Sequence, residues 1–242
     1  MAIKEVSTAK YERLAVEHDI SEAAVHQLCQ RHRNVINFVE SFTEGGSTFI
    51  VTEFAEGGSL LSFLQARNHY SLPEDHSRKI FAQLARAVQF MHKHGVVHRD
   101  LKHMNILLSD NTEDAIVKVT DFGIATYLEQ DEFIKKQAGT AGFMAPEVAQ
   151  NQLSNHKADV WSLGVILYAL ICSRVPFSGP SKEETRSKII NEQLKFADAE
   201  WAHVHPSLLE LISGMLTKDP KHRFSMKDVV DHPWVNAVPA TI

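Results

Sequence analysis

Short apolar runs in the first quarter of the chain predict β-strands. Residues 36–42 and 48–54 are rich in Phe, Ile, Val and Thr, which favour extended structure. The sequence Glu44-Gly45-Gly46-Ser47 lies between them, and its two adjacent glycines favour a tight turn. We therefore expect a β-hairpin here. A second glycine pair, Gly57-Gly58, ends this pattern, and the chain becomes mostly helical from that point.

Helical periodicity dominates the rest of the sequence. Between residues 73 and 95 the apolar positions form one stripe at a period of 3.6 residues: Ile80, Phe81, Leu84, Ala87, Val88 and Met91. Residues 157–172 are apolar nearly all round, which predicts a helix that runs through the core. Ser225, with Asp228 three residues later, predicts the start of a last helix before residues 232–233.

Composition narrows the class of protein. A chain of 242 residues can bury a sizeable core, in one large domain or in two lobes. Its formal net charge of −5 favours neither nucleic acid nor an anionic membrane as a partner. The longest apolar run, residues 163–172, is about half of a membrane span. Residues 1–5 lack a signal-peptide core, and Cys29 and Cys172 fit buried thiols in a reducing compartment. We expect a cytoplasmic protein, with the nucleus as an alternative, and the oligomeric state stays open.

One ordered set of polar residues carries the candidate chemistry. Residues 98–102, His-Arg-Asp-Leu-Lys, supply a carboxylate and an ammonium group, and Asn105 adds an amide. Asp121-Phe122-Gly123 supplies a second carboxylate, 21 residues after Asp100. This set suits phosphoryl transfer, which depends on positioning and charge neutralisation. Together with Ala145-Pro146-Glu147, these residues resemble the catalytic and metal-binding loops of eukaryotic protein kinases.

The resemblance implies a fold of the α+β class, a two-lobed protein-kinase-like fold. Residues 1–54 would form an incomplete sheet lobe with the lysine strand, the regulatory helix and the hairpin. Residues 55–235 would form a large helical lobe that carries the catalytic, metal-binding and activation loops, and residues 236–242 would be a tail. The two lobes would join near residues 53–58.

The same resemblance implies a role for each polar residue of the set. Asp100 would be the base that orients the substrate hydroxyl and accepts its proton. Lys102 would contact the γ-phosphate of ATP, and Asn105 and Asp121 would hold Mg²⁺. Lys102 and the later Gly139-Thr140 are typical of serine/threonine kinases. The expected function is therefore ATP-dependent phosphorylation of Ser or Thr in a protein substrate.

Lys4 resembles the strand lysine that pairs with the α- and β-phosphates and with a helix glutamate. Glu22, 18 residues later at the start of a helical pattern, would be that glutamate. His26 stands at a position that is usually Leu in the internal hydrophobic spine, a departure that bears on how this helix aligns.

The resemblance also implies an adenine site. Thr52 would be the gatekeeper, the residue at the back of the nucleotide site. The backbones of Glu53 and Ala55 would contact the base, and Ala2 and Leu107 would enclose it from two sides.

The last third of the chain is similar to calcium/calmodulin-dependent and calcium-dependent protein kinases, notably in residues 159–165 and 215–234. In such kinases Asp159 would brace the backbone of the catalytic loop, and Arg223 would form a structural ion pair with Glu147.

Two departures from the family pattern leave alternatives open. No glycine-rich loop precedes Lys4, so we expect a truncated sequence that binds ATP weakly as written, the alternative being a natural protein without this loop. A pseudokinase scaffold without appreciable ATP binding is the rival function, and a small-molecule kinase is a third. The usual phosphorylation position of the activation loop holds Lys136, whereas Arg99 normally contacts a phosphate there. Either Glu129, Asp131 and Glu132 partly stand in for the phosphate, or activation does not need one.

Substrate preference is partly encoded as well. Ser59, Met104 and Ala169 stand where kinases that prefer basic substrates carry acidic residues, so we expect no strong preference for Arg-rich sequences. Ile124, directly after Gly123, is typical of kinases that prefer threonine acceptors.

Overall fold

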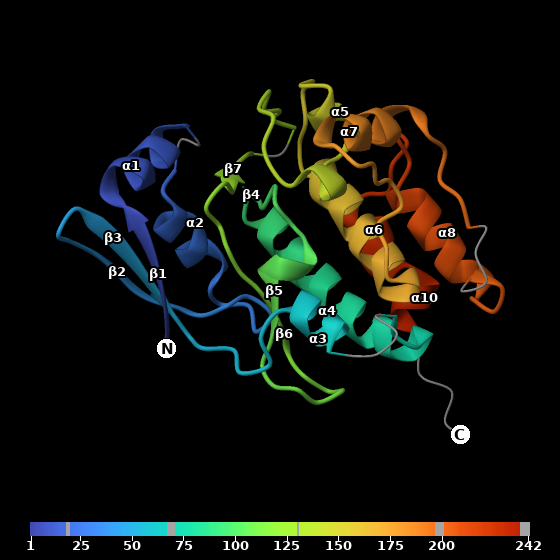
Figure 1. Cartoon of the computed structure of the whole chain (residues 1–242), viewed down its shortest axis with the longest axis horizontal. Coiled ribbons are helices and arrows are strands. Elements are labelled where there is room, and N and C mark those ends of the chain that lie inside the picture. The colour runs from blue at the N-terminus through green and yellow to red at the C-terminus, as the bar shows by residue number, and fades with distance from the viewer. Residues whose placement is uncertain (18–19, 67–70, 130, 197–200, 238–242) are drawn as a thin grey trace.

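The computed structural model describes residues 1–17, 20–66, 71–129, 131–196 and 201–237. A small lobe of sheet and two helices stands beside a larger lobe built mainly from helices (Figure 1). This arrangement agrees with the two-lobed α+β architecture expected from the sequence.

The small lobe is built on an antiparallel sheet of three strands in the order β1-β3-β2. Its strands are β1 (Ala2–Ser7), β2 (Phe38–Glu44) and β3 (Ser47–Thr52). The predicted hairpin is confirmed, although β2 begins two residues later than expected and both strands extend to the turn. Gly45 and Gly46 form that turn with φ of 57° and 82°, a left-handed conformation in which glycine is favoured. Strand β1 lies at the edge of the sheet, as expected for the lysine strand.

Two helices pack against this sheet, α1 (Thr8–Glu17) and α2 (Glu22–Cys29). Ser21 caps α2 by accepting a hydrogen bond from the backbone N–H of Ala24 at 3.2 Å, which fixes the helix start and places Glu22 in its first turn. Helix α2 was predicted from the sequence, whereas α1 was not.

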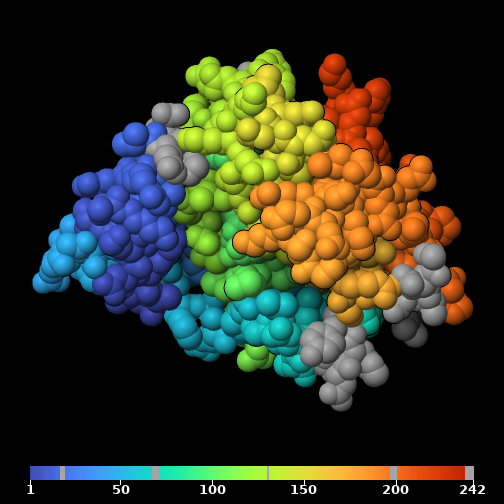
Figure 2. Space-filling view, turned by 45° about the horizontal axis from the view of Figure 1, so that its top comes forward, coloured from blue at the N-terminus to red at the C-terminus, as the bar shows by residue number. Residues whose placement is uncertain are grey.

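The large lobe contains most of the helices. Its elements are α3 (Leu60–Gln65), α4 (Glu74–Lys93), β4 (Val96–Val97), the 3₁₀ turn η1 (His103–Asn105), β5 (Ile106–Leu108), β6 (Val117–Val119), β7 (Thr126–Tyr127), the 3₁₀ turn η2 (Ala141–Phe143), α5 (Pro146–Ala149), α6 (Lys157–Cys172), α7 (Lys182–Asn191), α8 (Pro206–Met215), α9 (Met226–Asp231) and α10 (Pro233–Asn236). Figure 2 shows the N-terminal lobe in blue beside the green and yellow-green residues that follow α4.

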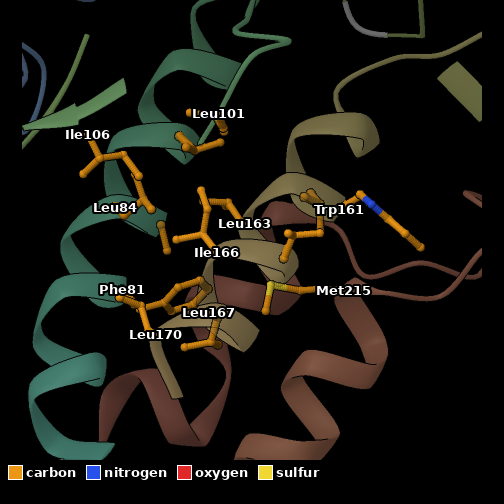
Figure 3. Packing of buried hydrophobic residues seen from close by; sticks show 14 of the residues in the cluster. Phe81, Leu84, Leu101, Ile106, Trp161, Leu163, Ile166, Leu167, Leu170 and Met215 are labelled. Atoms are coloured by element: carbon orange, nitrogen blue, oxygen red, sulfur yellow. The ribbon is translucent and has the colours of Figure 1, made fainter. Parts of the chain in front are cut away.

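Helix α6 forms the centre of the core. Fifteen of its residues are buried, and it contacts α4 on one side and α8 on another. Phe81 and Leu84 of α4 face Leu163 and Leu167 of α6, while Met215 of α8 closes the cluster (Figure 3). The predictions of an amphipathic helix that ends before Gly95 and of a fully buried helix over residues 157–172 are both confirmed. Among the described residues, no helix is long and apolar enough to cross a membrane.

The C-terminal end of the lobe also follows its sequence signals. Ser225 and Asp228 form a reciprocal capping box at the start of α9. A further short helix, α10, follows from Pro233, so α9 is not the last helix and Asn236 belongs to α10 rather than to the predicted tail. The rest of that tail, beyond residue 237, lies outside the described residues. Cys29 and Cys172 are both buried, and burial raises the pKa of the Cys29 thiol to about 12.

The expected Glu147–Arg223 ion pair is confirmed at the centre of the large lobe. Nη1 and Nη2 of Arg223 donate to the two carboxylate oxygens of Glu147 at 2.7 Å each, and both side chains are at most 3% exposed. Further guanidinium N–H groups donate to the carbonyls of Lys157, Thr217 and Lys218. The buried charge is therefore fully paired, and the pair ties α5 to the loop before α9.

Replacing Arg223 with Met leaves the Glu147 carboxylate buried without its partner. We expect the free energy of unfolding, measured in urea, to fall by about 3–5 kcal/mol. The control is Lys227→Ala, which removes the exposed Lys227–Asp231 pair and should leave stability nearly unchanged. Equal effects of the two substitutions would contradict a structural role for the buried pair.

Buried histidines make stability depend on pH. Burial lowers the pKa of His103 and of His156 to about 4, against about 6.5 in an unfolded chain. Between these values the unfolded chain binds more protons, so stability falls as the pH drops from 6.5 toward 4. At pH 5 the expected loss from His103 alone is about 2 kcal/mol relative to pH 7.5.

Urea unfolding at pH 7.5 and pH 5.0 measures this loss. His103→Gln should lose less stability between the two values than the unsubstituted chain, whereas His222→Gln, at an exposed position, should lose as much. The same loss in His103→Gln as in the unsubstituted chain would contradict the assignment.

Candidate active site

A buried carboxylate fixes the loop that follows β4. Asp159 of α6 is fully buried and accepts hydrogen bonds at 2.9 Å from the backbone N–H groups of His98 and Arg99 and from Nε2 of His92. Burial opposes ionisation of Asp159, but these donors outweigh it and lower its pKa. Arg99 has φ of 69°, a conformation unusual for a residue with a side chain, and the two backbone bonds hold it there. The brace expected of Asp159 is present.

Asp100, next along this loop, lies in a cluster of hydrogen bonds. Its Oδ2 accepts from Nζ of Lys102 at 2.5 Å, and its Oδ1 accepts from the hydroxyl of Thr140 at 2.7 Å. Lys102 also donates to Thr140 at 2.9 Å. The amide nitrogen of Asn105 donates to the carbonyl and to Oδ2 of Asp100. Three groups thus fix the orientation of one carboxylate.

Lys4 joins the two lobes. Its Nζ lies 2.7 Å from Oε1 of Glu22 in α2 and 2.7 Å from Oδ1 of Asp121, which follows β6. Burial alone would lower the pKa of Lys4, but the two carboxylates raise it. Burial likewise opposes ionisation of Asp121, but Lys4 outweighs burial, and the pKa of Asp121 is lowered. Glu22 is more enclosed, so burial outweighs the effect of Lys4 and raises the pKa of Glu22. The lysine–glutamate pair implied by the family resemblance is present.

Gly123 lies against this three-residue cluster. A Cβ at this position would stand 3.3 Å from Nζ of Lys4, from Oε2 of Glu22 and from Oδ1 of Asp121. Asp121 itself has φ of 66°. The absence of a side chain at residue 123 therefore allows the lysine and both carboxylates to meet.

The structure also brings the two residues predicted to hold a metal ion close together. The backbone N–H of Thr120 donates to the carbonyl of Asn105 at 3.0 Å, which places Asn105 beside the residue that precedes Asp121. Asn105 uses its amide nitrogen toward Asp100, and this leaves its side-chain oxygen for another partner. The Asp121 carboxylate is 40% exposed. An amide oxygen and an accessible carboxylate are ligands that suit Mg²⁺.

A cavity of about 310 Å³ lies between the lobes at the hinge. All seven residues predicted to contact the nucleotide line it: Ala2, Lys4, Thr52, Glu53, Ala55, Leu107 and Asp121. The side chain of Glu53 is used internally, because it pairs with Lys118 at 2.6 Å and accepts from the N–H of Asn37. Its backbone N–H donates to the carbonyl of Asn37 at 2.9 Å, and its carbonyl accepts from the Thr52 hydroxyl at 3.1 Å.

His26 occupies the back of the same cavity. Its ring stacks on Phe122 at 4.7 Å between centroids, and its Nε2 donates to the carbonyl of Ile36 at 2.6 Å. Burial lowers its pKa, which favours the neutral ring. The unusual histidine is therefore compatible with a docked α2, in which Glu22 reaches Lys4.

Arg99 extends beneath the segment that follows Gly123. Its guanidinium group donates to the carbonyls of Ile124 at 3.3 Å and of Lys136 at 3.4 Å. The backbone of Lys136, which stands at the usual phosphorylation position, thus contacts Arg99 directly.

Three residues that support the site were not among those predicted for it. Thr140 was noted only as a sign of kinase class, although its hydroxyl contacts both Asp100 and Lys102. Gly123 was quoted only as part of a motif, and no role in the site was predicted for His92. None has a local sequence signal for its contact, because each acts through residues distant in the chain.

Comparison with known proteins agrees with this geometry. The sequence model of the protein kinase domain matches residues 1–235. The chain belongs to the protein kinase domain family.

Its curated relatives include calcium-dependent and calcium/calmodulin-dependent protein kinases. CDPK-related kinase 4 of Arabidopsis thaliana is 34% identical over 236 residues, which cover 97% of this chain and 39% of that protein. Calcium-dependent protein kinase 20 of Oryza sativa subsp. japonica is 32% identical over 98% of this chain and 43% of its own length. Calcium/calmodulin-dependent protein kinase type 1 of Caenorhabditis briggsae is 34% identical over 85% of this chain and 57% of its own length. The chain thus spans about two fifths to three fifths of these relatives.

Gly123→Ala tests the packing of the Lys4 cluster. The added methyl group forces the lysine and both carboxylates to shift by a few tenths of an ångström. We expect the affinity for Mg·ADP, measured by calorimetry, to fall about three- to tenfold, since charge-assisted contacts depend steeply on geometry. Gly142→Ala is the control, because its Cβ would meet only Val175 at 3.9 Å. Unchanged affinity in Gly123→Ala would contradict the proposed packing.

Proposed function

We propose that this chain is the catalytic domain of a serine/threonine protein kinase, which transfers the terminal phosphate of Mg·ATP to a hydroxyl group of a protein substrate. The observation that carries the proposal is the convergence of two separately built clusters at one site. Lys4, Glu22 and Asp121 form one, and Asp100 with Lys102 forms the other. Phosphoryl transfer needs a positioned nucleotide and an activated acceptor. The first cluster would position the nucleotide, and the second would activate the acceptor.

The nucleotide would occupy the cavity at the hinge. Ala2 and Leu107 would enclose the adenine ring, and the backbones of Glu53 and Ala55 would offer it hydrogen bonds. Lys4 would contact the α- and β-phosphates while Glu22 holds it in place. Bound Mg·ATP supplies the phosphoryl group and a divalent charge, with Asn105 and Asp121 as the residues that would hold the metal.

Asp100 would act on the acceptor hydroxyl. Its carboxylate is oriented by Thr140, Lys102 and Asn105, so a hydroxyl placed beside it can give up its proton as the oxygen attacks the phosphorus. Lys102, within 2.5 Å of Asp100, would neutralise charge on the phosphoryl group during transfer.

The identity of the substrate is also a proposal. We propose a protein acceptor with Thr favoured over Ser, because Ile124 follows Gly123, and without a strong preference for basic sequences. Ser59 caps α3, and Ala169 is buried in α6. Neither residue is acidic, so neither position offers a carboxylate to a basic peptide. We further propose a cytoplasmic location, since a sequence with two cysteines, both buried, fits a reducing compartment.

A pseudokinase scaffold without appreciable ATP binding is the rival function. Against it stands the geometry of Lys4, Glu22, Asp121, Asp100 and Asn105, because a scaffold has no physical need for charged groups held in this arrangement.

Asp100→Asn distinguishes the two functions. Transfer of phosphate from Mg·[γ-³²P]ATP to a threonine-containing protein should fall by about 10²–10⁴-fold, since the variant loses the base. Binding of Mg·ADP should stay within about twofold, because Asp100 is not among the residues proposed to hold the nucleotide. Asp231→Asn, at an exposed position in α9, is the matched control and should keep full activity.

Two results would contradict the proposal. Phosphate transfer that persists at the original rate in Asp100→Asn would remove Asp100 from the mechanism. Failure of the unsubstituted chain to bind Mg·ATP or to transfer phosphate would favour the scaffold.

A further inference from the structure

A second cavity adjoins the one at the hinge. It also measures about 310 Å³, and Lys4, Glu22 and Asp121 line both cavities. From these shared residues the second cavity extends to Asp100 and to helix α1. A molecule that fills the hinge cavity and extends past Lys4 therefore enters a space with Asp100 on one side and α1 on the other.

Helix α1 is fixed at this wall by contacts to the sheet and to α2. The backbone N–H of Thr8 donates to the carbonyl of Gly46 at 2.9 Å, and Thr48 donates to the Thr8 hydroxyl at 3.2 Å. The Tyr11 hydroxyl accepts from the N–H of Ala23 at 3.3 Å. Four residues on one side of α1 line the cavity: Lys10, Tyr11, Leu14 and Ala15. The helix thus presents one cation, Lys10, to the cavity from a fixed position.

The charged side chains that line this cavity differ in whether they already form ion pairs. Lys4 is paired with both Glu22 and Asp121, and Asp100 is paired with Lys102. Lys10, by contrast, forms no ion pair or hydrogen bond with another side chain in the part of the chain that the structure describes, and it is exposed. It is therefore available to an anion that enters from the hinge side.

We propose that Lys10 of α1 binds the terminal phosphate of the nucleotide, as a further phosphate-binding lysine beside Lys4 and Lys102. This inference rests on the proposed function, because that function places the adenine ring at the hinge and the phosphates beside Lys4. The terminal phosphate then lies in the second cavity, between Asp100 and α1. A lysine has three rotatable donors on a long flexible stem, which suits contact with a phosphate from an exposed helix face. The contact also offsets the repulsion between the polyanion and the nearby carboxylates.

A second anion could meet the same lysine, namely an acidic side chain of a protein substrate. The nucleotide is favoured because Lys10 shares its cavity with Lys4 and Asp121, the residues proposed to hold phosphates and metal. The two ligands make different predictions, since only the first requires the phosphate to belong to the nucleotide.

Calorimetry with Mg·ATP, Mg·ADP and adenosine tests the proposal on the whole chain. Lys10→Ala should weaken Mg·ATP binding about fivefold, the effect of one exposed charged contact. It should weaken Mg·ADP less and leave adenosine unchanged. Lys10→Arg should restore most of the Mg·ATP affinity. Arg13→Ala is the matched control, because Arg13 is an exposed cation on the same helix that does not line the cavity, and it should change none of the three affinities.

Each other outcome overturns the inference. Equal weakening by Lys10→Ala and Arg13→Ala would indicate a general effect of net charge, and unchanged Mg·ATP binding in Lys10→Ala would remove the contact. A raised KM for an acidic peptide with unchanged Mg·ATP affinity would assign Lys10 to the substrate. In these three cases the proposed function survives, whereas no Mg·ATP binding by the unsubstituted chain would end both proposals.

Discussion

One ammonium group held between two carboxylates connects the halves of this molecule at their active face. Lys4 comes from the edge strand β1, Glu22 from the first turn of α2, and Asp121 from the loop after β6 in the large lobe. Small shifts of the sheet or of α2 lengthen at least one of the two contacts. The position of the small lobe therefore affects the contact of Lys4 with Asp121, the residue proposed to hold the metal. Such dependence on geometry is expected where catalysis relies on positioning.

The large lobe provides the fixed side of this arrangement. Asp159 on the buried helix α6 holds the backbone of His98 and Arg99, and this places Asp100. The Glu147–Arg223 pair holds the segment that follows the activation region. Both carboxylates are buried and paired, so they define the geometry of neighbouring loops while contacting none of the proposed ligands. The site thus combines loops that buried carboxylates hold in the large lobe with contacts that come from the small lobe.

The sequence predicted those parts of the structure that local patterns encode. Helix α4 and helix α6 have clear apolar patterns, and the glycine pair at residues 45–46 marked the hairpin turn. The Lys4–Glu22 pair was inferred only through resemblance to a family, because their spacing of 18 residues has no meaning without the fold. Helix α1 was not predicted: it has no acidic residue in its first turn and no basic residue in its last, and its apolar Val16 is exposed.

Long-range contacts account for the remainder. The left-handed backbone at Arg99 and Asp121 and the bond from Thr140 to Asp100 depend on segments that meet only after folding. The cavity wall made by Lys10 depends in the same way on where α1 docks. A motif identifies such residues as a set, but their orientation follows from neighbours far away in the chain.

The central claim is that Lys4, Glu22 and Asp121 act as one unit in holding the nucleotide. A double-mutant cycle on Mg·ADP affinity, with Lys4→Arg, Glu22→Gln and the combined variant, measures this most directly. The account predicts that the two effects are non-additive by at least about 0.5 kcal/mol, as found for residues in contact. Additive effects would contradict it.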